Sequence, residues 1–341
     1  MKKLPLKMYI CMLAAIIFIS SSAQAAQWKT LRTGSEGHDV YALKLLLLHR
    51  KYDPGEINTI FDNKTAEALI SFQKQHGLSP NGTTGPGTWN KLISMVGMSS
   101  ESPEDNNAIK AVQYLLKNKY SFSSLDTDGN YDLGTKAAIL LFQSNYNIGV
   151  NGAAGIDGVV GAKTWSYLIR DSEISDNRSW VICIEFKHDR GLLGRLYLYD
   201  AAGALMLEMP CLGQSMTMNT DWREQNANTP LGCFRAKVSH RGRNLLEYGK
   251  YQCIELNDDD VKAVTNGRNG ILIHSGANKF KHKPDYQMPQ KYSNIRAQNI
   301  QGLDQTHGCV RISDVDHARL DDLLKGHSRG IVSISEISTT S

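Results

Sequence analysis

The sequence lacks a strong surplus of charge of either sign. Its 341 residues hold 38 Lys and Arg against 34 Asp and Glu, a net charge of +4, and three of those lysines lie in the first 25 residues. A nucleic-acid-binding protein normally carries a basic surplus or stripe, so this class is excluded. The 41% hydrophobic, 21% charged and 8% aromatic contents are ordinary for a globular protein, which excludes disordered and fibrous classes.

Long apolar segments are also missing. Spanning a bilayer takes about 20 apolar residues, and the longest run, residues 8–19, is shorter. Lysines precede this run, and Ala23, Gln24 and Ala25 follow it in an A-x-A cleavage pattern. We therefore predict a signal peptide over residues 1–25 and an exported, periplasmic or cell-wall-associated protein, with an uncleaved anchor as the alternative. Cys11 lies inside the apolar run, which argues against a lipoprotein.

Metal-binding patterns are absent. The chain has no H-E-x-x-H or H-x-x-E-H motif that would make its histidines a zinc peptidase site. Residues 126–132 resemble a calcium loop in composition, but Tyr131 stands where an EF-hand requires Gly. A polar turn explains this segment, and we predict no metal or cofactor.

Five cysteines remain after the signal peptide, and an odd number leaves at least one thiol outside any intramolecular disulfide. Four lie in apolar or strand-like surroundings, as buried small hydrophobes or in disulfides of undetermined pairing: Cys183, Cys211, Cys233 and Cys253. Cys309 differs, because it follows His307 and Gly308 in a polar loop.

The first half of the chain contains an internal repeat. At an offset of 70 residues, the matching pairs are Phe61 with Tyr131, Asp62 with Asp132, Thr65 with Thr135, Phe72 with Phe142, and Gln73 with Gln143. The Gly-x-x-Thr-Trp segment ending at Trp89 recurs at Trp165, an offset of 76. The second copy therefore carries a six-residue insertion near residues 149–156.

Each copy is predicted to form three short helices. In the first copy, the first helix is predicted to cover residues 40–49, the second to begin at Thr65 as N-cap, and the third to begin at Thr88. The residues predicted to point inward are Val40, Leu43, Leu47, Leu48, Ala66, Leu69, Ile70, Phe72, Trp89 and Leu92, then Val112, Leu115, Ala138, Leu141, Phe142, Trp165 and Leu168. Residues 99–107 are predicted to be a linker.

Three features of the repeat resemble the peptidoglycan-binding three-helix module found beside bacterial cell-wall enzymes. They are the opening at residues 31–37, the Thr-x-x-Ala…Phe-Gln helix and the Gly-x-x-Thr-Trp close. The resemblance implies two small all-α modules over residues 27–97 and 105–172, with peptidoglycan stem peptides and glycan strands as partners. Most matching residues are core or turn residues, so a spacer role is the alternative.

After residue 170 the pattern changes to short runs rich in branched and aromatic residues. Strands are predicted at residues 180–186, 195–199, 205–209, 232–238 and 270–274, with residues 331–337 alternating at the end of the chain. Ser313 is predicted to cap a helix with Val315, Leu320, Leu323 and Leu324 inward and Gly326 at its end. We therefore predict a mostly-β domain over residues 178–337.

Within this domain, a histidine at a strand end and a cysteine after a glycine form a candidate acyl-transfer site. A cysteine reacts as the thiolate and needs a neighbouring base, and imidazole suits that task near neutral pH. Gly308 before Cys309 permits a tight turn and leaves its N–H open to a developing oxyanion. His274, at the end of a strand, is the candidate base.

The segments 273–276 and 306–311, with the Thr-Pro-Leu-Gly-Cys-Phe run from Thr229, resemble the L,D-transpeptidase (YkuD-like) catalytic family. The resemblance implies a β-sandwich-like catalytic domain with Cys309 as nucleophile and His274 as general base. The remaining implied site residues are Ser275, orienting His274 through its backbone; His307, lining the site; Gly308 with Cys309, supplying oxyanion N–H groups; and Thr306 with Arg311, contacting substrate. Arg311 fits a substrate carboxylate, with a structural salt bridge as the alternative.

The family implies an exported cysteine acyltransferase that forms 3→3 cross-links from tetrapeptide stems, releases D-Ala, and is acylated by carbapenems. His274 and Thr306 are separated by 31 residues, a longer interval than the family usually shows, and residues 278–301 resemble an inserted loop. A loop there that excluded the acceptor amine would leave an L,D-carboxypeptidase. A non-catalytic wall-binding protein is the other alternative. An NlpC/P60-type peptidase is disfavoured, because its Cys precedes its His in the chain.

Overall fold

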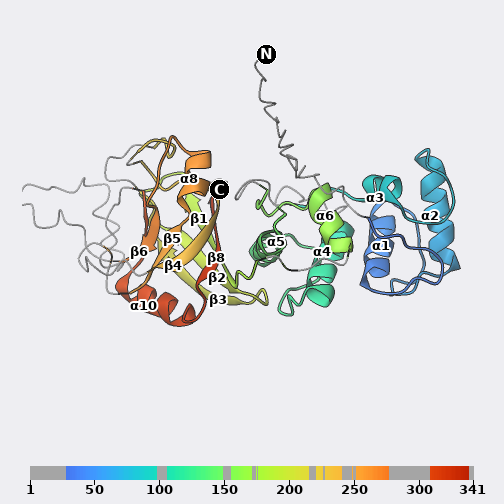
Figure 1. Cartoon of the computed structure of the whole chain (residues 1–341), viewed down its shortest axis with the longest axis horizontal. Helices are drawn as coiled ribbons and strands as arrows, with labels where there is room; N and C mark the ends of the chain where they lie inside the picture. Colours follow the sequence, from blue (N-terminus) through green and yellow to red (C-terminus); the bar gives the residue numbers. More distant parts are fainter. Residues whose placement is uncertain are drawn as a thin grey trace, which may run out of the picture.

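The computed structural model describes residues 28–97, 106–148, 155–170, 174, 176–214, 220–225, 227–239, 248, 251–275 and 308–337. Two groups of helices and one sheet follow one another along the long axis of the molecule (Figure 1). The predicted fold class, two small all-α modules followed by a mostly-β domain, is confirmed. None of the helices in the described ranges is long and apolar enough to cross a membrane, and the predicted signal peptide lies outside those ranges.

Each helical module contains three helices. The first module consists of α1 (His38–His49), α2 (Asn63–Gln75) and α3 (Pro86–Leu92), and the second of α4 (Asn106–Lys119), α5 (Leu133–Asn145) and α6 (Ala162–Ile169). The helix α4 begins inside the segment predicted to be a linker.

Two predicted helix starts were wrong. Asp62, rather than Thr65, caps α2: its carboxylate accepts a hydrogen bond from the Thr65 N–H, and Asp132 caps α5 in the same way. An Asx cap satisfies an N–H of the first turn, so the helix starts before the threonine. The helix α3 starts at Pro86, because proline fits the first helical position, where no N–H partner is needed.

The predicted inward positions are confirmed in the second copy and only partly in the first. All seven of the second copy are buried, whereas Leu48, Ala66 and Ile70 are half-buried. The helix α1 buries more than one face, including Leu45 and Leu46, because it packs against α4 of the other module as well as against α2.

Buried glutamines hold the turns between helices. In α2 and α5, Nε2 of Gln73 and Gln143 donates to the hydroxyl of Thr88 and Thr164, at 3.2 and 3.3 Å. Each Oε1 accepts from a turn glycine N–H at 3.0 Å. Gln113 of α4 repeats this arrangement on the turn at residues 126–132. A buried amide must be hydrogen-bonded, and these three amides fix the turns that connect the helices.

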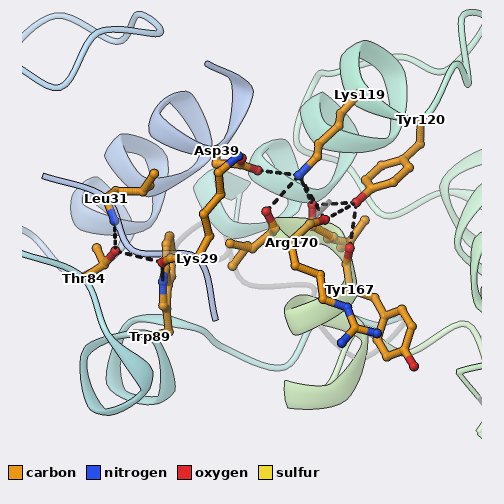
Figure 2. Close-up of polar contacts among 11 residues, drawn as sticks. Lys29, Leu31, Asp39, Thr84, Trp89, Lys119, Tyr120, Tyr167 and Arg170 are labelled. Atoms are coloured by element: carbon orange, nitrogen blue, oxygen red, sulfur yellow. Dashed lines mark hydrogen bonds and ion pairs between the residues drawn. The ribbon is translucent and has the colours of Figure 1, made fainter. Parts of the chain in front are cut away.

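The two modules are joined by a buried ionic network (Figure 2). The carboxylate of Asp39 accepts from Lys29 Nζ at 2.6 Å and from Lys119 Nζ at 2.8 Å. Lys119 Nζ also lies 2.8–3.2 Å from the main-chain carbonyl oxygens of residues 168–170, and the Tyr120 hydroxyl lies within 3.0 Å of carbonyl oxygens of the same turn. An α-helix does not satisfy its own last carbonyls, so these contacts hold the end of α6 and tie it to α1.

The C-terminal domain is built on one eight-stranded sheet in the order β3-β2-β1-β8-β4-β5-β6-β7. The strands are β1 (Trp180–Lys187), β2 (Gly194–Asp200), β3 (Leu205–Cys211), β4 (Gly232–Ser239), β5 (Cys253–Leu256), β6 (Leu272–His274), β7 (Val310–Arg311) and β8 (Arg329–Ile337). Neighbours are antiparallel except β1–β8 and β6–β7. Leu212, just after β3, and Arg311 of β7 exchange two backbone hydrogen bonds of 2.9 Å, so the sheet closes on itself.

The last strand does not alternate as predicted. In β8 five consecutive residues from Gly330 to Ile334 are buried. This strand lies between β1 and β4, with one face against α5 and the other in the core of the domain. One hydrophobic cluster therefore runs from both helical modules onto the outer face of the sheet, where it includes Val181 and Ile331.

The described part of the domain also contains α8 (Asp258–Val264) and α10 (Asp314–Leu323). Ser313 caps α10 as predicted, but Val315 is 72% exposed rather than inward. Leu320 and Leu324 are buried as predicted, and Leu323 packs half-buried against the core. The buried face also contains His317. Positions three and four apart share a helix face, so a face centred on residue 317 turns residue 315 toward solvent.

Candidate active site

Cys309 lies at the seam where the sheet closes. It directly precedes β7, and its side chain is only partly buried. The Leu272 N–H points at Sγ at 3.4 Å, and the thiol faces the Gly270 carbonyl at 3.8 Å. The thiol of Cys309, the candidate nucleophile, therefore lies against residues 270–272, where β6 begins.

His274 ends β6, the strand parallel to β7, and only 2% of it is exposed. The register pairs His274 with Arg311, which places Cys309 two positions back along the neighbouring strand, about 7 Å. The structure therefore brings the two residues from segments 35 positions apart to one edge of the sheet.

The protonation of His274 follows from its partner. Nδ1 lies 2.7 Å from the Ser275 carbonyl oxygen, which can only accept, so Nδ1 carries the proton and Nε2 is left as the base. Nη1 of Arg311 donates to the same carbonyl at 2.8 Å and lies 3.3 Å from Nδ1.

Arg311 of β7 lies beside His274. It is 4% exposed, and its guanidinium contacts the Ser275 carbonyl and the edge of His274. Arg311 therefore helps to hold the carbonyl that orients His274, the candidate base. The substrate contact of Arg311 stays a prediction.

Arg268 lies against the glycine before the nucleophile, and no sequence motif indicated it. It is 1% exposed, and its guanidinium donates to the carbonyls of Trp222, Asn228 (2.7 Å) and Ala227 (3.2 Å). Gly308 has a φ of +110°, and a Cβ added there would overlap Nη2 of Arg268. Burial lowers the pKa of Arg268, and the Cys309 thiolate opposes that shift. The position before Cys309 therefore requires glycine for two reasons, backbone conformation and space.

Thr229 contacts the main chain at Cys309. It is fully buried, and its hydroxyl lies 3.2 Å from both the Cys309 carbonyl and the Gly213 carbonyl. Its N–H donates to Gly213 at 2.9 Å. The Thr-Pro segment that carried part of the sequence resemblance thus fixes the backbone at Cys309.

Several predicted site residues are not among those described. Thr306, His307 and the interval 278–301 lie outside the described ranges. Gly308, Cys309, His274, Ser275 and Arg311 lie inside them and come together at the closed edge of the sheet.

The remaining cysteines have a different environment from Cys309. None of the five is in a disulfide, and Cys183, Cys211 and Cys253 are buried. Burial raises the pKa of Cys183 to about 12 and also raises the pKa of Cys211 and of Cys233. These side chains are inert thiols near neutral pH, as expected for buried small hydrophobes. Within the described ranges, no three His, Cys, Asp or Glu side chains are grouped to hold a metal.

Comparison with known families identifies the helical modules. Residues 36–92 and 105–168 each match the model of a putative peptidoglycan binding domain. The N-terminal half is therefore a tandem pair of these modules.

Solved structures with some similarity include a fused Zn-dependent amidase/peptidase/peptidoglycan-binding domain-containing protein from Clostridium acetobutylicum (15% identity, 91% of this chain and 100% of that one, TM-score 0.25). Others are an L,D-transpeptidase from Xylanimonas cellulosilytica (18%, 67% and 92%, TM-score 0.25) and the helical cell shape determining protein Pgp2 from Campylobacter jejuni (16%, 47% and 49%, TM-score 0.29). The chain spans about half of Pgp2. TM-scores this low say nothing about the activity of this chain.

Proposed function

We propose that this protein is an exported peptidoglycan-modifying cysteine acyltransferase, an L,D-transpeptidase that forms 3→3 cross-links from tetrapeptide stems. The observation that carries the proposal is the arrangement of Cys309, His274 and the Ser275 carbonyl at the closed edge of the sheet. The two peptidoglycan-binding modules would bind the cell wall. We place the modules at residues 27–97 and 105–172 and the catalytic domain at residues 178–337.

The first step forms a thioester. Cys309 gives its proton to Nε2 of His274, and Sγ attacks the carbonyl carbon of the L-centred third residue. The N–H groups of Gly308 and Cys309 stabilise the oxyanion. Collapse breaks the peptide bond to the terminal D-Ala, whose amine takes the proton from His274.

The acceptor decides the second step. The side-chain amine of another stem attacks the thioester, forms the cross-link and releases the Cys309 thiol. Water as acceptor gives an L,D-carboxypeptidase with the same nucleophile and base.

The continuous core between modules and sheet supports a wall-anchored enzyme. The helix α5 packs against β1 and β8, so the peptidoglycan-binding modules and the site form one packed unit. A module that holds peptidoglycan would thereby keep stem peptides at high local concentration near Cys309.

The test is mass spectrometry of tetrapeptide muropeptides after incubation with residues 26–341. Cys309→Ala is expected to be inactive. Cys183→Ala is the matched control, since it also removes one thiol, but a buried one in β1. Cross-linked 3→3 dimers with release of D-Ala support the transpeptidase, and tripeptide alone supports the carboxypeptidase. No turnover by wild type, together with no carbapenem adduct on Cys309, would leave a wall-binding protein.

A further inference from the structure

A second histidine lies behind His274, and the proposed reaction does not use it. His317 of α10 is 0% exposed. Its Nδ1 lies 3.2 Å from the Ser275 backbone nitrogen and 2.9 Å from the Ser275 hydroxyl oxygen. On the other side of the ring, Nε2 lies 2.8 Å from the Gln252 carbonyl oxygen.

These partners fix the tautomer of His317. A backbone N–H can only donate, so Nδ1 must be the unprotonated nitrogen. A carbonyl can only accept, so Nε2 carries the proton. Burial also lowers the pKa of His317, which keeps the ring neutral. The imidazole therefore acts as a rigid connector between the backbone after β6 and the backbone before β5.

Every polar group of Ser275 is then occupied. Its N–H and hydroxyl are directed at His317, and its carbonyl accepts from His274 Nδ1 and from Arg311. The Ser275 N–H shares one rigid peptide plane with the His274 carbonyl, which accepts from the Ile312 N–H at 3.1 Å, so this plane is held on both sides. The contact of the Ser275 hydroxyl with His317 holds the same residue by its side chain, so the Cα from which the Ser275 carbonyl projects is fixed. The direction of that carbonyl sets the ring orientation of His274.

The element that carries His317 is itself firmly docked. Ser313 caps α10, and Leu320 and Leu324 are buried in the core of the domain. The Ile312 N–H donates to the His274 carbonyl at 3.1 Å, so the chain leading into α10 also holds the base.

We propose that His317 is a positioning residue: by accepting from Ser275 it holds the Ser275 carbonyl that orients His274 toward Cys309. The inference rests on the proposed function in that it assigns His274 as the base for Cys309.

Two isosteric substitutions separate this role from simple packing. In His317→Asn the side-chain oxygen can take the place of Nδ1 and accept from Ser275. In His317→Gln the amide reaches toward Gln252 and the acceptor at the Nδ1 position is lost. Both variants remove the imidazole ring. They differ in the hydrogen bond that they keep, to Ser275 in His317→Asn and to the Gln252 carbonyl in His317→Gln.

The readout is the rate of iodoacetamide alkylation of Cys309 as a function of pH, in the full mature chain. The buried cysteines make a small background, which Cys309→Ala measures. We expect His317→Gln to slow alkylation at neutral pH by about tenfold and to shift the pH profile upward, because a misplaced base withdraws part of a contribution of about 10²–10⁴. His317→Asn should stay within about threefold of wild type.

Equal rates in both variants, or equal losses that follow their loss of thermal stability, would overturn the inference. If both variants fail to fold, Ser275→Ala and Ser275→Thr become the decisive pair, because the first loses the 2.9 Å hydroxyl contact with His317 and the second keeps it. We expect a shifted pH profile in Ser275→Ala alone, and identical profiles in the two would also overturn the inference. Alkylation needs no peptidoglycan substrate, so a wild type that shows this pattern but releases no D-Ala would contradict the proposed function and leave the role of His317 standing.

Discussion

Buried polar side chains have different tasks in the two halves of this molecule. In the helical half, Gln73, Gln113 and Gln143 hold turns, and Lys119 satisfies the end of a helix. In the sheet domain, four buried polar residues form one hydrogen-bonded cluster behind the candidate site: His274, Ser275, Arg311 and His317. Buried Arg268 lies against Gly308, the residue before Cys309. Burial of a polar group therefore does not identify a site, whereas a cluster of such groups beside a nucleophile does.

The two helical copies teach a related lesson. The equivalent helices α2 and α5 each have 13 residues, of which five are buried in α2 and ten in α5. The helix α5 lies between its own module and the sheet, which covers both of its faces. Among the described residues, α2 in the copy away from the sheet therefore has more exposed positions than α5.

The largest expected effect is on the chemistry alone. His274→Ala should reduce carbapenem acylation of Cys309 by about 10²–10⁴, because it removes the base. The free energy of unfolding should fall by less than about 2 kcal/mol, as for a typical substitution. Intact-mass kinetics and urea unfolding of one preparation measure both, and near wild-type acylation would move the role of base elsewhere.

The next effect tests the space before the nucleophile. Gly308→Ala places a Cβ on the Arg268 guanidinium at a φ of +110° and should lower the acylation rate by about 10². Gly267→Ala is the matched control, since Gly267 also has a positive φ, +77°, but nothing lies within 4 Å of its Cβ position. Equal rates for the two variants would show that the contact with Arg268 is unimportant.

A substitution in the helical half should affect stability and leave chemistry intact. Gln143→Met strands the buried Gly158 N–H and should cost about 1–3 kcal/mol of unfolding free energy, with a similar cost for Gln73→Met. Thermal or urea unfolding measures the cost, and acylation of Cys309 should stay within about twofold. Slower acylation in Gln143→Met alone would mean that the module beside the sheet supports the site.

The smallest effect is a pH dependence of stability from His317. Burial lowers its pKa below the ordinary 6.5, with Arg311 acting in the same direction and Asp314 and Asp321 against it. The folded state thus prefers the neutral ring, so this contribution is complete above pH 6.5 and is lost as the pH falls below it. Melting temperatures should fall more in wild type than in His317→Asn between about pH 7 and about pH 5. Parallel curves would contradict a neutral, buried His317.

Much of the helical half could be predicted, because each helix carries its apolar residues at helical spacing along a short stretch of sequence. The repeat and the spacing of apolar residues located all six helices. Errors arose where one residue competes with another, as Asp62 does with Thr65 for the cap of α2. The burial of α1 on several faces depends on α4, and no pattern within α1 reports that contact.

In the site, the sequence named Cys309, Gly308, His274 and Ser275, which the structure places at one edge of the sheet. It missed Arg268 and the present role of His317. Each is a single residue in an unremarkable segment, and each gains its contacts only when distant segments pack together.

The sequence by itself determined the class of fold, the repeat, and the residue types of a thiol–imidazole site, because helical periodicity, strand patterns and short motifs are written along the chain. Only the tertiary structure decided that the sheet closes between Leu212 and Arg311, that α5 is covered by β1 and β8, and that His317 and Arg268 support the site. The reason is physical: hydrogen bonds and packing between residues far apart in sequence depend on how whole elements meet, and no local pattern encodes that meeting.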